Sequence, residues 1–293
     1  MAELAGVEPE RLLLPAARSS LLWRRTAGRV EHQPLFDLNI SDTTVAAASQ
    51  NLIAAARLTQ PTRVVFANAH VINEMSARPA YRAVVASADR IYADGSGLAV
   101  AARLAGQPFA DNVNGTDVFP RLAADAVAAN VKIFLLGGRP GTAEAARQRM
   151  IGFGLGDALC GAHHGFFASG SPAEDDAIAA VNAAGASIVL VGMGVPLQDE
   201  WIAANAHRIN APVLAGVGGL FDFFAGSVRR APHAFRVIGC EWVWRLMQEP
   251  RRMARRYLVG NVRFLALAMQ EAARIRTVRG RLVPQTGDVP AVR

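Results

Sequence analysis

The residues of this chain that could do acid–base chemistry stand at the ends of short apolar segments. The stretch IYADGSG, residues 91–97, closes an apolar segment with Asp94 and continues with Gly95, Ser96 and Gly97. A lone carboxylate at the end of a strand can serve as a general base, which takes a proton from a reacting hydroxyl group. The small residues let a ligand approach the backbone where the next helix begins. Asp94 could instead be only the N-cap of that helix, and this segment alone leaves both interpretations open.

Glycine-rich stretches follow three more predicted strands. The pair Gly137-Gly138 follows the segment 131–136, GMGVPLQDEW begins at Gly192, and GVGGLFDFFAG begins at Gly216. Backbone N–H groups in such loops bind phosphate oxygens, since no side chain blocks the approach. Three such glycine-rich loops, each at the point where a strand leaves the sheet, predict a nucleotide or sugar-phosphate ligand at that edge. The glycines that we expect to line it are Gly95, Gly97, Gly137, Gly138, Gly192 and Gly194.

Apolar or β-branched runs alternate with alanine-rich helical segments from Leu35 onward. We expect strands at 63–67, 90–93, 131–136, 187–191 and 212–215. Helices are expected near 42–58, 96–104, 116–130, 142–150, 172–184 and 197–208. This alternation predicts an α/β fold with a Rossmann-like, doubly wound parallel sheet. Ligands of such sheets bind in the crevice beyond the carboxyl ends of the strands, where Asp94 is expected.

The charge of the chain is concentrated near its end. The net charge is +7, and Lys132 is the one lysine among 31 basic residues. Much of the arginine content therefore reflects a general preference for arginine over lysine, and not phosphate recognition. The segment 245–263 nevertheless carries six arginines against one acid, Glu249. A basic end of this kind suggests nucleic acid, an anionic membrane surface or a phosphorylated substrate as partner. The cysteines Cys160 and Cys240 share no motif, which is typical of free thiols in a reducing cytoplasm.

We divide the chain into an irregular leader (1–34), an α/β core (35–228), a helical appendage (229–275) and a disordered tail (276–293). The acidic start MAELAGVEPER does not resemble a secretion signal, and the longest apolar run, 183–197, is too short to cross a membrane. In the appendage, Met253, Tyr257, Phe264 and Leu267 fall near one helical face, and most arginines fall off it. This pattern predicts a basic amphipathic helix on an anionic membrane surface, with packing against the core as the alternative.

Several common nucleotide and metal motifs are missing from the sequence. The dinucleotide fingerprint fails after Gly192-x-Gly194, because Leu197 stands where its third glycine belongs. There is no P-loop, no zinc-type spacing of Cys and His, and no Asp-x-Asp motif that would hold a divalent metal on a diphosphate. The charge of a departing diphosphate would then be met by arginines and helix N-termini, and we expect no metal or other cofactor.

A series of spaced motifs resembles the WecG/TagA/CpsF glycosyltransferases over residues 35–257. The motifs are FANAH with Asn68, DGSG from Asp94, NGTD from Asn114, FLLGG from Phe134, HHGFF from His163, GMGVPLQDEW from Gly192, GVGGLFDFFAG from Gly216, RRAP from Arg229, and EWVWRLMQEPRRMARR from Glu241. The resemblance implies an inverting, metal-independent enzyme that moves a sugar from a UDP-sugar to a polyprenyl-diphosphate-linked saccharide. It also implies a peripheral enzyme on the cytoplasmic face of the membrane that serves surface or exopolysaccharide synthesis.

The resemblance also implies residue roles. Asp94 takes the place of the general base, and Gln198 that of a nucleotide contact with Asp199 as its acidic neighbour. The remaining positions that it implies for substrate binding are Asn68, Asp222, Arg245, Arg252 and Arg255. Phe66 and Asn112 depart from residues found in some members, so the sugar, described only as a hexose or N-acetylhexosamine, stays open. A homo-oligomer is compatible with the sequence. The alternatives are an NAD-type oxidoreductase and a nucleic-acid-binding protein, although no nucleic-acid module is present.

Overall fold

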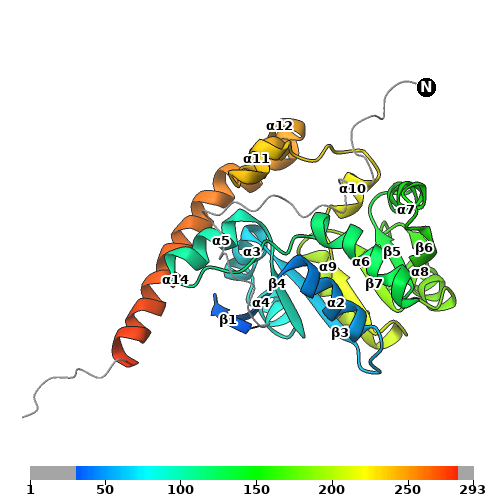
Figure 1. Ribbon diagram of the computed structural model, residues 1–293, viewed down its shortest axis with the longest axis horizontal. Helices are drawn as coiled ribbons and strands as arrows, with labels where there is room; N and C mark the ends of the chain where they lie inside the picture. Colours follow the sequence, from blue (N-terminus) through cyan, green and yellow to red (C-terminus); the bar gives the residue numbers. More distant parts are fainter. Residues whose placement is uncertain (1–30, 283–293) are drawn as a thin grey trace, which may run out of the picture.

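The computed structural model describes residues 31–282, in which one eight-stranded sheet has the order β1-β2-β4-β3-β8-β7-β5-β6 (Figure 1). Its strands are β1 (Glu31–Leu35), β2 (Leu38–Asp42), β3 (Thr62–Ala67), β4 (Arg90–Ala93), β5 (Ile133–Gly137), β6 (Leu159–His163), β7 (Ile188–Gly192) and β8 (Val213–Gly216). β1 pairs antiparallel with β2, and all other pairs are parallel. The predicted α/β doubly wound sheet is confirmed.

Helices cover both faces of the sheet, because alternate strand residues point to opposite sides. Val64 of β3 belongs to an apolar cluster with helices on one face, whereas Val65 belongs to a cluster on the other. The first face carries α2 (Val45–Ala55), α6 (Gly115–Ala129), α7 (Thr142–Gly152) and α10 (Leu220–Phe224). The second carries α3 (Ala69–Ala77), α4 (Pro79–Ala86), α5 (Gly95–Leu104), α8 (Pro172–Ala183), α9 (Leu197–Asn205) and α14 (Gly260–Leu282).

The order of the strands creates a switch point in the middle of the sheet. The chain builds β2, β3 and β4 on one side, crosses through α5 and α6, and then builds β5, β6, β7 and β8 on the other. β3 and β8 meet at the centre, with Val65 opposite Gly216. The carboxyl ends of the parallel strands therefore share one edge, where Asp94 and the glycine-rich exits were expected.

Three strands were not anticipated from the sequence. β1 and β2 turn through Phe36 and Asp37, which adopt positive φ angles of 57° and 60° without the usual glycine signal. β6 has the sequence LCGAH, whose glycine and terminal histidine weaken the strand pattern. Residues 31–34 thus belong to the sheet and not to an irregular leader, whose residues 1–30 lie outside the described part of the chain.

The C-terminal part of the chain returns to the core as a run of helices. α11 (His233–Val237), α12 (Glu241–Gln248), α13 (Pro250–Ala254) and a π-helical segment (Arg255–Val259) lead into α14, the long helix at the left of Figure 1. The backbone stays helical to Leu282, so residues 276–282 do not form the disordered tail that was expected. Residues 283–293 lie outside the described range.

α14 packs directly on the core through its apolar side. Phe264 and Ala268 are 5% and 0% exposed and join the same apolar cluster as residues of β3 and β4. Glu271 accepts a hydrogen bond from the backbone N–H of Phe36 at 2.8 Å, which joins α14 to the β1–β2 turn. The helical face predicted to enter a membrane, which includes Met253 and Phe264, is therefore buried in the protein. Packing against the core, the alternative interpretation, is the correct one for this face.

Candidate active site

Asp94 and Asn68 stand side by side at the exits of β4 and β3. Ala93 and Ala67 are direct partners in the parallel register, so the next residue of each strand enters the same crevice. The Asn68 side-chain amide donates a hydrogen bond from Nδ2 to Asp94 Oδ2 at 3.2 Å. Its Oδ1 accepts the backbone N–H groups of His70 and Val71, which caps α3 and fixes the amide. The structure therefore brings two predicted site residues into contact.

The Asp94 carboxylate does not serve as a helix cap. It precedes α5, but its side chain makes no capping hydrogen bond to that helix. Asp94 therefore occupies the N-cap position of α5 without capping it through its side chain, and its catalytic role remains a prediction. Its partly buried position is held by the strand register and by Asn68, both of which are properties of the core.

Burial raises the pKa of Asp94 to about 6. The hydrogen bond from Asn68 and the positive charge of Arg256 act in the opposite direction, whereas the carboxylate of Asp117 raises the pKa further. At pH 7 the group is mostly ionised, and its pKa lies within about one unit of neutral pH. A general base works best when its pKa lies near the working pH.

The appendage places a second carboxylate, that of Glu241, close enough to Asp94 for the two charges to affect each other. Glu241, in the first turn of α12, has a pKa raised to about 7, mainly by burial. Arg230 lowers that pKa, and the charges of Asp117 and Asp94 raise it. Arg230 itself donates a hydrogen bond to Asp117 near the start of α6, so the segment between core and appendage is tied to the site.

The appendage also brings two of the expected arginines to Asp222. Arg245 is 9% exposed, and its Nη2 lies 3.7 Å from Asp222 Oδ2. Its Nε lies 2.7 Å from Glu249 Oε2, and its guanidinium lies 4.7 Å from the centre of the Phe223 ring. Arg252 Nη1 approaches Asp222 Oδ2 at 3.6 Å. Asp222 thus pairs with both guanidinium groups, and the predicted contacts of these three residues with a substrate remain predictions.

The neighbour of the third expected arginine lies within electrostatic reach of Asp94. Arg255 is exposed, whereas Arg256 is half-buried and close enough for its charge to lower the pKa of both Asp94 and His70. For His70 burial is the larger cause, and its pKa falls to about 4. A π-helical turn contains more residues than an α-helical turn, so the segment 255–259 changes which arginine faces inward. Arg255 was expected from the family resemblance, and its predicted contact with a substrate remains a prediction.

Three arginines of the appendage keep unused hydrogen-bonding capacity. Arg236 Nε, Arg245 Nη1 and Arg256 Nε are buried atoms without a hydrogen-bond partner in the described part of the chain. A buried donor without a partner costs free energy, so each such group calls for an explanation. An anionic ligand with several oxygens, such as a diphosphate, supplies the missing acceptors.

The predicted glycines shape the crevice through close packing. A Cβ atom on Gly97 would lie 3.0 Å from Ala69 Cβ, and one on Gly137 would lie 2.5 Å from the backbone of Gly192. The amide of Gly95 donates to Asn112 Oδ1 at 2.7 Å, and that of Gly138 donates to the Gly192 carbonyl at 2.9 Å. These amides are already in use, so their predicted phosphate contacts would require other bonds to break.

Gln198 and Asp199 lie beneath the glycine-rich loops. Both side chains are 3% exposed, and Gln198 Oε1 accepts the backbone N–H groups of Gly194 at 3.2 Å and Gly218 at 2.7 Å. Asp199 Oδ2 accepts a hydrogen bond from the Tyr81 hydroxyl at 2.6 Å. Gln198 therefore organises the loop backbone in this structure, and its predicted contact with the nucleotide remains a prediction.

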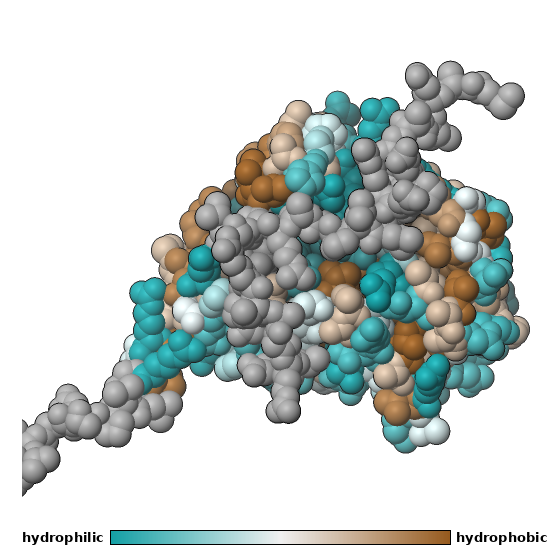
Figure 2. Space-filling view, in the orientation of Figure 1, coloured by the Kyte–Doolittle hydropathy of each residue, from teal (hydrophilic) through white to brown (hydrophobic). Residues whose placement is uncertain are grey.

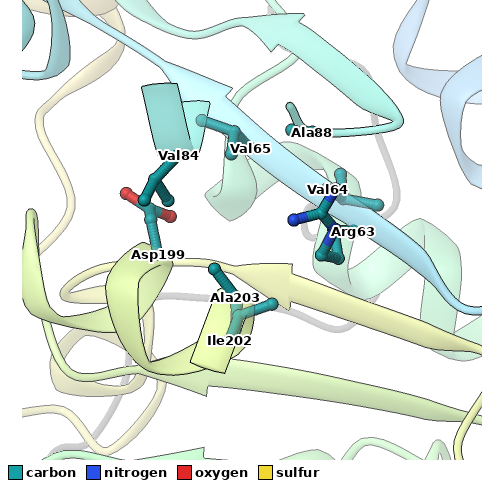
Figure 3. Close-up of a pocket in the computed structure, with 8 residues that line it drawn as sticks. All are labelled: Arg63, Val64, Val65, Val84, Ala88, Asp199, Ile202 and Ala203. Carbon is teal, nitrogen blue, oxygen red and sulfur yellow. The ribbon is translucent and has the colours of Figure 1, made fainter. Parts of the chain in front are cut away.

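A small cavity lies beside Asp199, where α9 approaches α4 and β3 (Figure 3). It holds about 10 Å³ and is lined by side chains that include Val65, Val84 and Ile202. That volume is enough for about one water molecule and excludes a nucleotide. This cavity therefore belongs to the packing between these elements.

Two further properties bear on metals and membranes. Within residues 31–282, no three His, Cys, Asp or Glu side chains are grouped so that they could hold a metal ion. No helix in the same range combines the length and apolar character needed to cross a membrane.

Several site residues were not singled out from the sequence. Asp117 and Arg230 lie within the quoted motifs NGTD and RRAP, and Glu241 opens the motif EWVWRLMQEPRRMARR. Their polar character inside otherwise recognisable motifs is the signal that could have identified them. Arg256 carried no such signal, since it differs from Arg255 only by the local π-helical geometry.

Comparison with known proteins agrees with this geometry. Residues 33–278 match the family model described as the glycosyl transferase WecG/TagA/CpsF family. Relatives from Staphylococcus aureus strains MW2, NCTC 8325 / PS 47 and COL are each 29% identical over 228 residues, which cover 75% of this chain and 86% of the relative. Each is named N-acetylglucosaminyldiphosphoundecaprenol N-acetyl-beta-D-mannosaminyltransferase. Because the family model spans most of its length, this chain belongs to the WecG/TagA/CpsF family of glycosyltransferases.

Proposed function

We propose that this glycosyltransferase moves a hexose or N-acetylhexosamine from a UDP-sugar to a polyprenyl-diphosphate-linked saccharide. The transfer inverts the configuration at the anomeric carbon, needs no metal and serves surface or exopolysaccharide synthesis. The observation that carries the proposal is the paired Asp94 and Asn68 at the strand edge, within electrostatic reach of Arg256. The names of the Staphylococcus aureus relatives, which specify an N-acetylhexosamine and a diphosphoundecaprenol acceptor, support the two substrate classes.

Asp94 acts as the general base in this reaction. Its carboxylate accepts the proton of the acceptor hydroxyl while that oxygen attacks the anomeric carbon of the donor. The new carbon–oxygen bond forms on the face opposite the diphosphate, and the bond from the anomeric carbon to the phosphate oxygen breaks. UDP leaves with the bonding electrons, and Asp94 is left protonated. Asn68 holds the carboxylate through the 3.2 Å hydrogen bond.

The appendage arginines stabilise the charge on the departing diphosphate. Arg245 and Arg256 each have a buried nitrogen that finds no hydrogen-bond partner among residues 31–282, and a phosphate oxygen could accept a hydrogen bond from it. Arginine forms forked bonds to phosphate, and these are stronger than bonds between neutral groups. Arg252 and Arg245 are oriented by Asp222, which reduces the conformational freedom that binding would otherwise remove.

An exposed apolar strip on the appendage supports docking on an anionic membrane surface. Figure 2 shows hydrophobic side chains over α11–α13 and the start of α14. The exposed residues there include Leu258, Val262 and Leu265, at 59%, 71% and 46% exposure. They recur at i, i+4 and i+7, and they are exposed, whereas Phe264 is buried. Exposed arginines, among them Arg251 and Arg255, flank the strip, as in helices that lie in a membrane interface.

The activity itself is tested with purified protein, a panel of UDP-sugars and a short-chain polyprenyl-diphosphate sugar, with product mass as readout. We expect one UDP-sugar to give a product heavier by one sugar residue, and the rate to be unchanged by EDTA. A companion measurement is the melting temperature of the protein, which UDP should raise and NAD should not. Turnover that stops with EDTA and returns with a divalent cation would contradict metal independence, and no product with any donor would contradict the proposed substrates.

The role of Asp94 predicts a specific loss in Asp94→Asn. This change keeps the side-chain shape and removes the base, so kcat should fall by about 10²–10⁴-fold while UDP affinity stays nearly the same. In the unaltered enzyme, protonation of Asp94 should make kcat decline as the pH falls through about 6. Rates are measured from pH 5 to 8 with saturating donor. Full activity of the variant would remove Asp94 from the mechanism.

The inward position of Arg256 predicts that Arg256→Gln is far more damaging than Arg251→Gln, which alters an exposed arginine of α13. Loss of a charged hydrogen bond to the diphosphate should lower kcat/KM by about 10- to 100-fold. Arg256 also lowers the pKa of Asp94, so the acid limb of kcat should move to higher pH in Arg256→Gln. A soluble short-chain acceptor keeps membrane effects out of the comparison. Equal rates for the two variants would exclude Arg256 from the site.

The membrane proposal predicts co-sedimentation of the protein with anionic vesicles and not with neutral ones. The double change Val262→Glu with Leu265→Glu should abolish binding, because it places charges in the apolar strip. Leu58→Glu, which alters an exposed leucine away from the appendage, is the matched control and should bind normally. A dimer in solution that the double variant converts to a monomer, without vesicle binding by either, would assign the strip to a second copy instead.

A further inference from the structure

A chain of buried hydrogen bonds links α4 to two of the glycine-rich strand exits. The Tyr81 hydroxyl, on a side chain that is 0% exposed, donates to Asp199 Oδ2 at 2.6 Å. Asp199 Oδ1 lies 3.5 Å from Gln198 Nε2, on the other side of its carboxylate. Gln198 Oε1 then accepts from Gly194, which follows β7, and from Gly218, which follows β8. None of these side chains is needed for packing alone, because apolar groups of similar size would fill the same volume.

We propose that Tyr81 is a positioning residue, which sets the orientation of Gln198 through Asp199 and so shapes the loops after β7 and β8 for donor binding. This inference rests on the proposed function, since it assigns the donor to that edge. Tyr81 does not reach the crevice and touches no reacting atom. Its effect travels through a carboxylate and an amide that are both buried.

The direction of the Gln198 amide decides whether the loops are held. Two backbone N–H groups require an acceptor, so Oε1 and not Nε2 must face Gly194 and Gly218. A reversed amide would place donors against donors. The ionised Asp199 prevents this reversal, because its Oδ1 accepts only from the Nε2 side. Gly216 leaves the space for this arrangement, since a Cβ there would lie 2.6 Å from Asp199 Oδ1 and 2.7 Å from Gln198 Nε2.

Two hydrogen bonds favour the ionised form of Asp199, whereas burial of its side chain disfavours it. Burial raises its pKa to about 6, and the hydrogen bonds from Tyr81 and Gln198 lower it. Glu200 on the same helix raises the pKa, and Arg78 pairs with Glu200 at 3.6 Å and with Glu74 of α3 at 4.0 Å. Arg63 of β3 lines the cavity on another side. Burial also raises the pKa of Tyr81, so its hydroxyl stays protonated and remains a donor.

Tyr81→Phe removes one of the two hydrogen bonds that lower the pKa of Asp199. Its pKa should then rise above about 6, and the carboxylate should be lost at a higher pH than in the unaltered protein. Tyr92→Phe is the matched control. The Tyr92 ring is also 0% exposed, and its hydroxyl is a buried atom without a hydrogen-bond partner in the described part of the chain. The two variants thus remove the same atom from equally buried rings.

The first measurement is amide hydrogen exchange of the full-length protein at pH 7, resolved at Gly194 and Gly218. Tyr81→Phe should raise exchange at both amides by about fivefold, the factor that corresponds to one hydrogen bond of about 1 kcal/mol. Amides of the β1–β2 pair serve as an internal reference and should not change. Tyr92→Phe should leave Gly194 and Gly218 as they are. Unchanged exchange at both amides in Tyr81→Phe would overturn the inference.

The second measurement is UDP affinity by calorimetry between pH 5.5 and 8. Tyr81→Phe should bind UDP about fivefold more weakly at pH 7. As the pH is lowered, the UDP affinity of this variant should begin to fall at a higher pH than that of the unaltered protein. With the sugar donor the change should appear in KM and leave kcat at saturation nearly intact. A pH profile identical to that of the unaltered protein would contradict the positioning role, as would a loss confined to kcat.

The two experiments separate this inference from the proposed function. If the unaltered protein does not bind UDP, the proposed donor is wrong, and amide exchange still decides whether Tyr81 positions the loops. If Tyr81→Phe fails to fold, Asp199→Asn replaces it. That change keeps the shape and removes the titrating group, so it should raise exchange at Gly194 and Gly218 without any dependence on pH near 6. Normal exchange in Asp199→Asn would overturn the inference equally.

Discussion

The site depends on a balance of electrostatic effects at one carboxylate. Asp94 lies at a strand exit where burial makes its ionised form costly, and Asn68 and Arg256 offset part of that cost. Burial raises the pKa of the carboxylate and so makes it a stronger base, whereas Asn68 and Arg256 lower that pKa and favour the ionised form that can accept a proton. The parallel register of β3 and β4 places Asn68 beside it, whereas the appendage supplies Arg256. The base is therefore complete only when the two ends of the fold meet.

That meeting is secured by packing of α14 against the first strands of the sheet. α14 buries Phe264 and Ala268 in the cluster that contains β3 and β4, and Glu271 holds the β1–β2 turn. The buried apolar face contributes most of the attachment, since each large side chain removed from water stabilises it by about 1.5–3 kcal/mol. The π-helical segment before α14 turns Arg256 toward Asp94. The appendage is thus part of the core on one side and keeps an apolar strip free on the other.

Two carboxylates of this edge have a pKa near 6 for the same main reason and with different consequences. Asp94 is partly exposed at the strand exit, the position that the proposed role as a general base requires. Asp199 is closed behind the loops, where it accepts hydrogen bonds from Tyr81 and Gln198. Burial alone therefore does not identify a catalytic acid or base. What separates the two is access to the crevice and the identity of the hydrogen-bond partners.

The sequence by itself determined the five central strands, the glycine-rich exits, Asp94 and the family motifs. These features are local, because hydrophobic alternation and a motif can be read within a few residues. Tertiary structure alone decided that β1, β2 and β6 join the sheet and that Phe264 faces inward. It also decided that Arg256 and not Arg255 is half-buried, and that Gln198 holds Gly194 and Gly218. Each of these depends on groups far apart in the chain, whose contacts exist only once the helices have packed on the sheet. An amphipathic pattern shows that a helix has an apolar face, whereas the neighbours that cover that face are set by the fold as a whole.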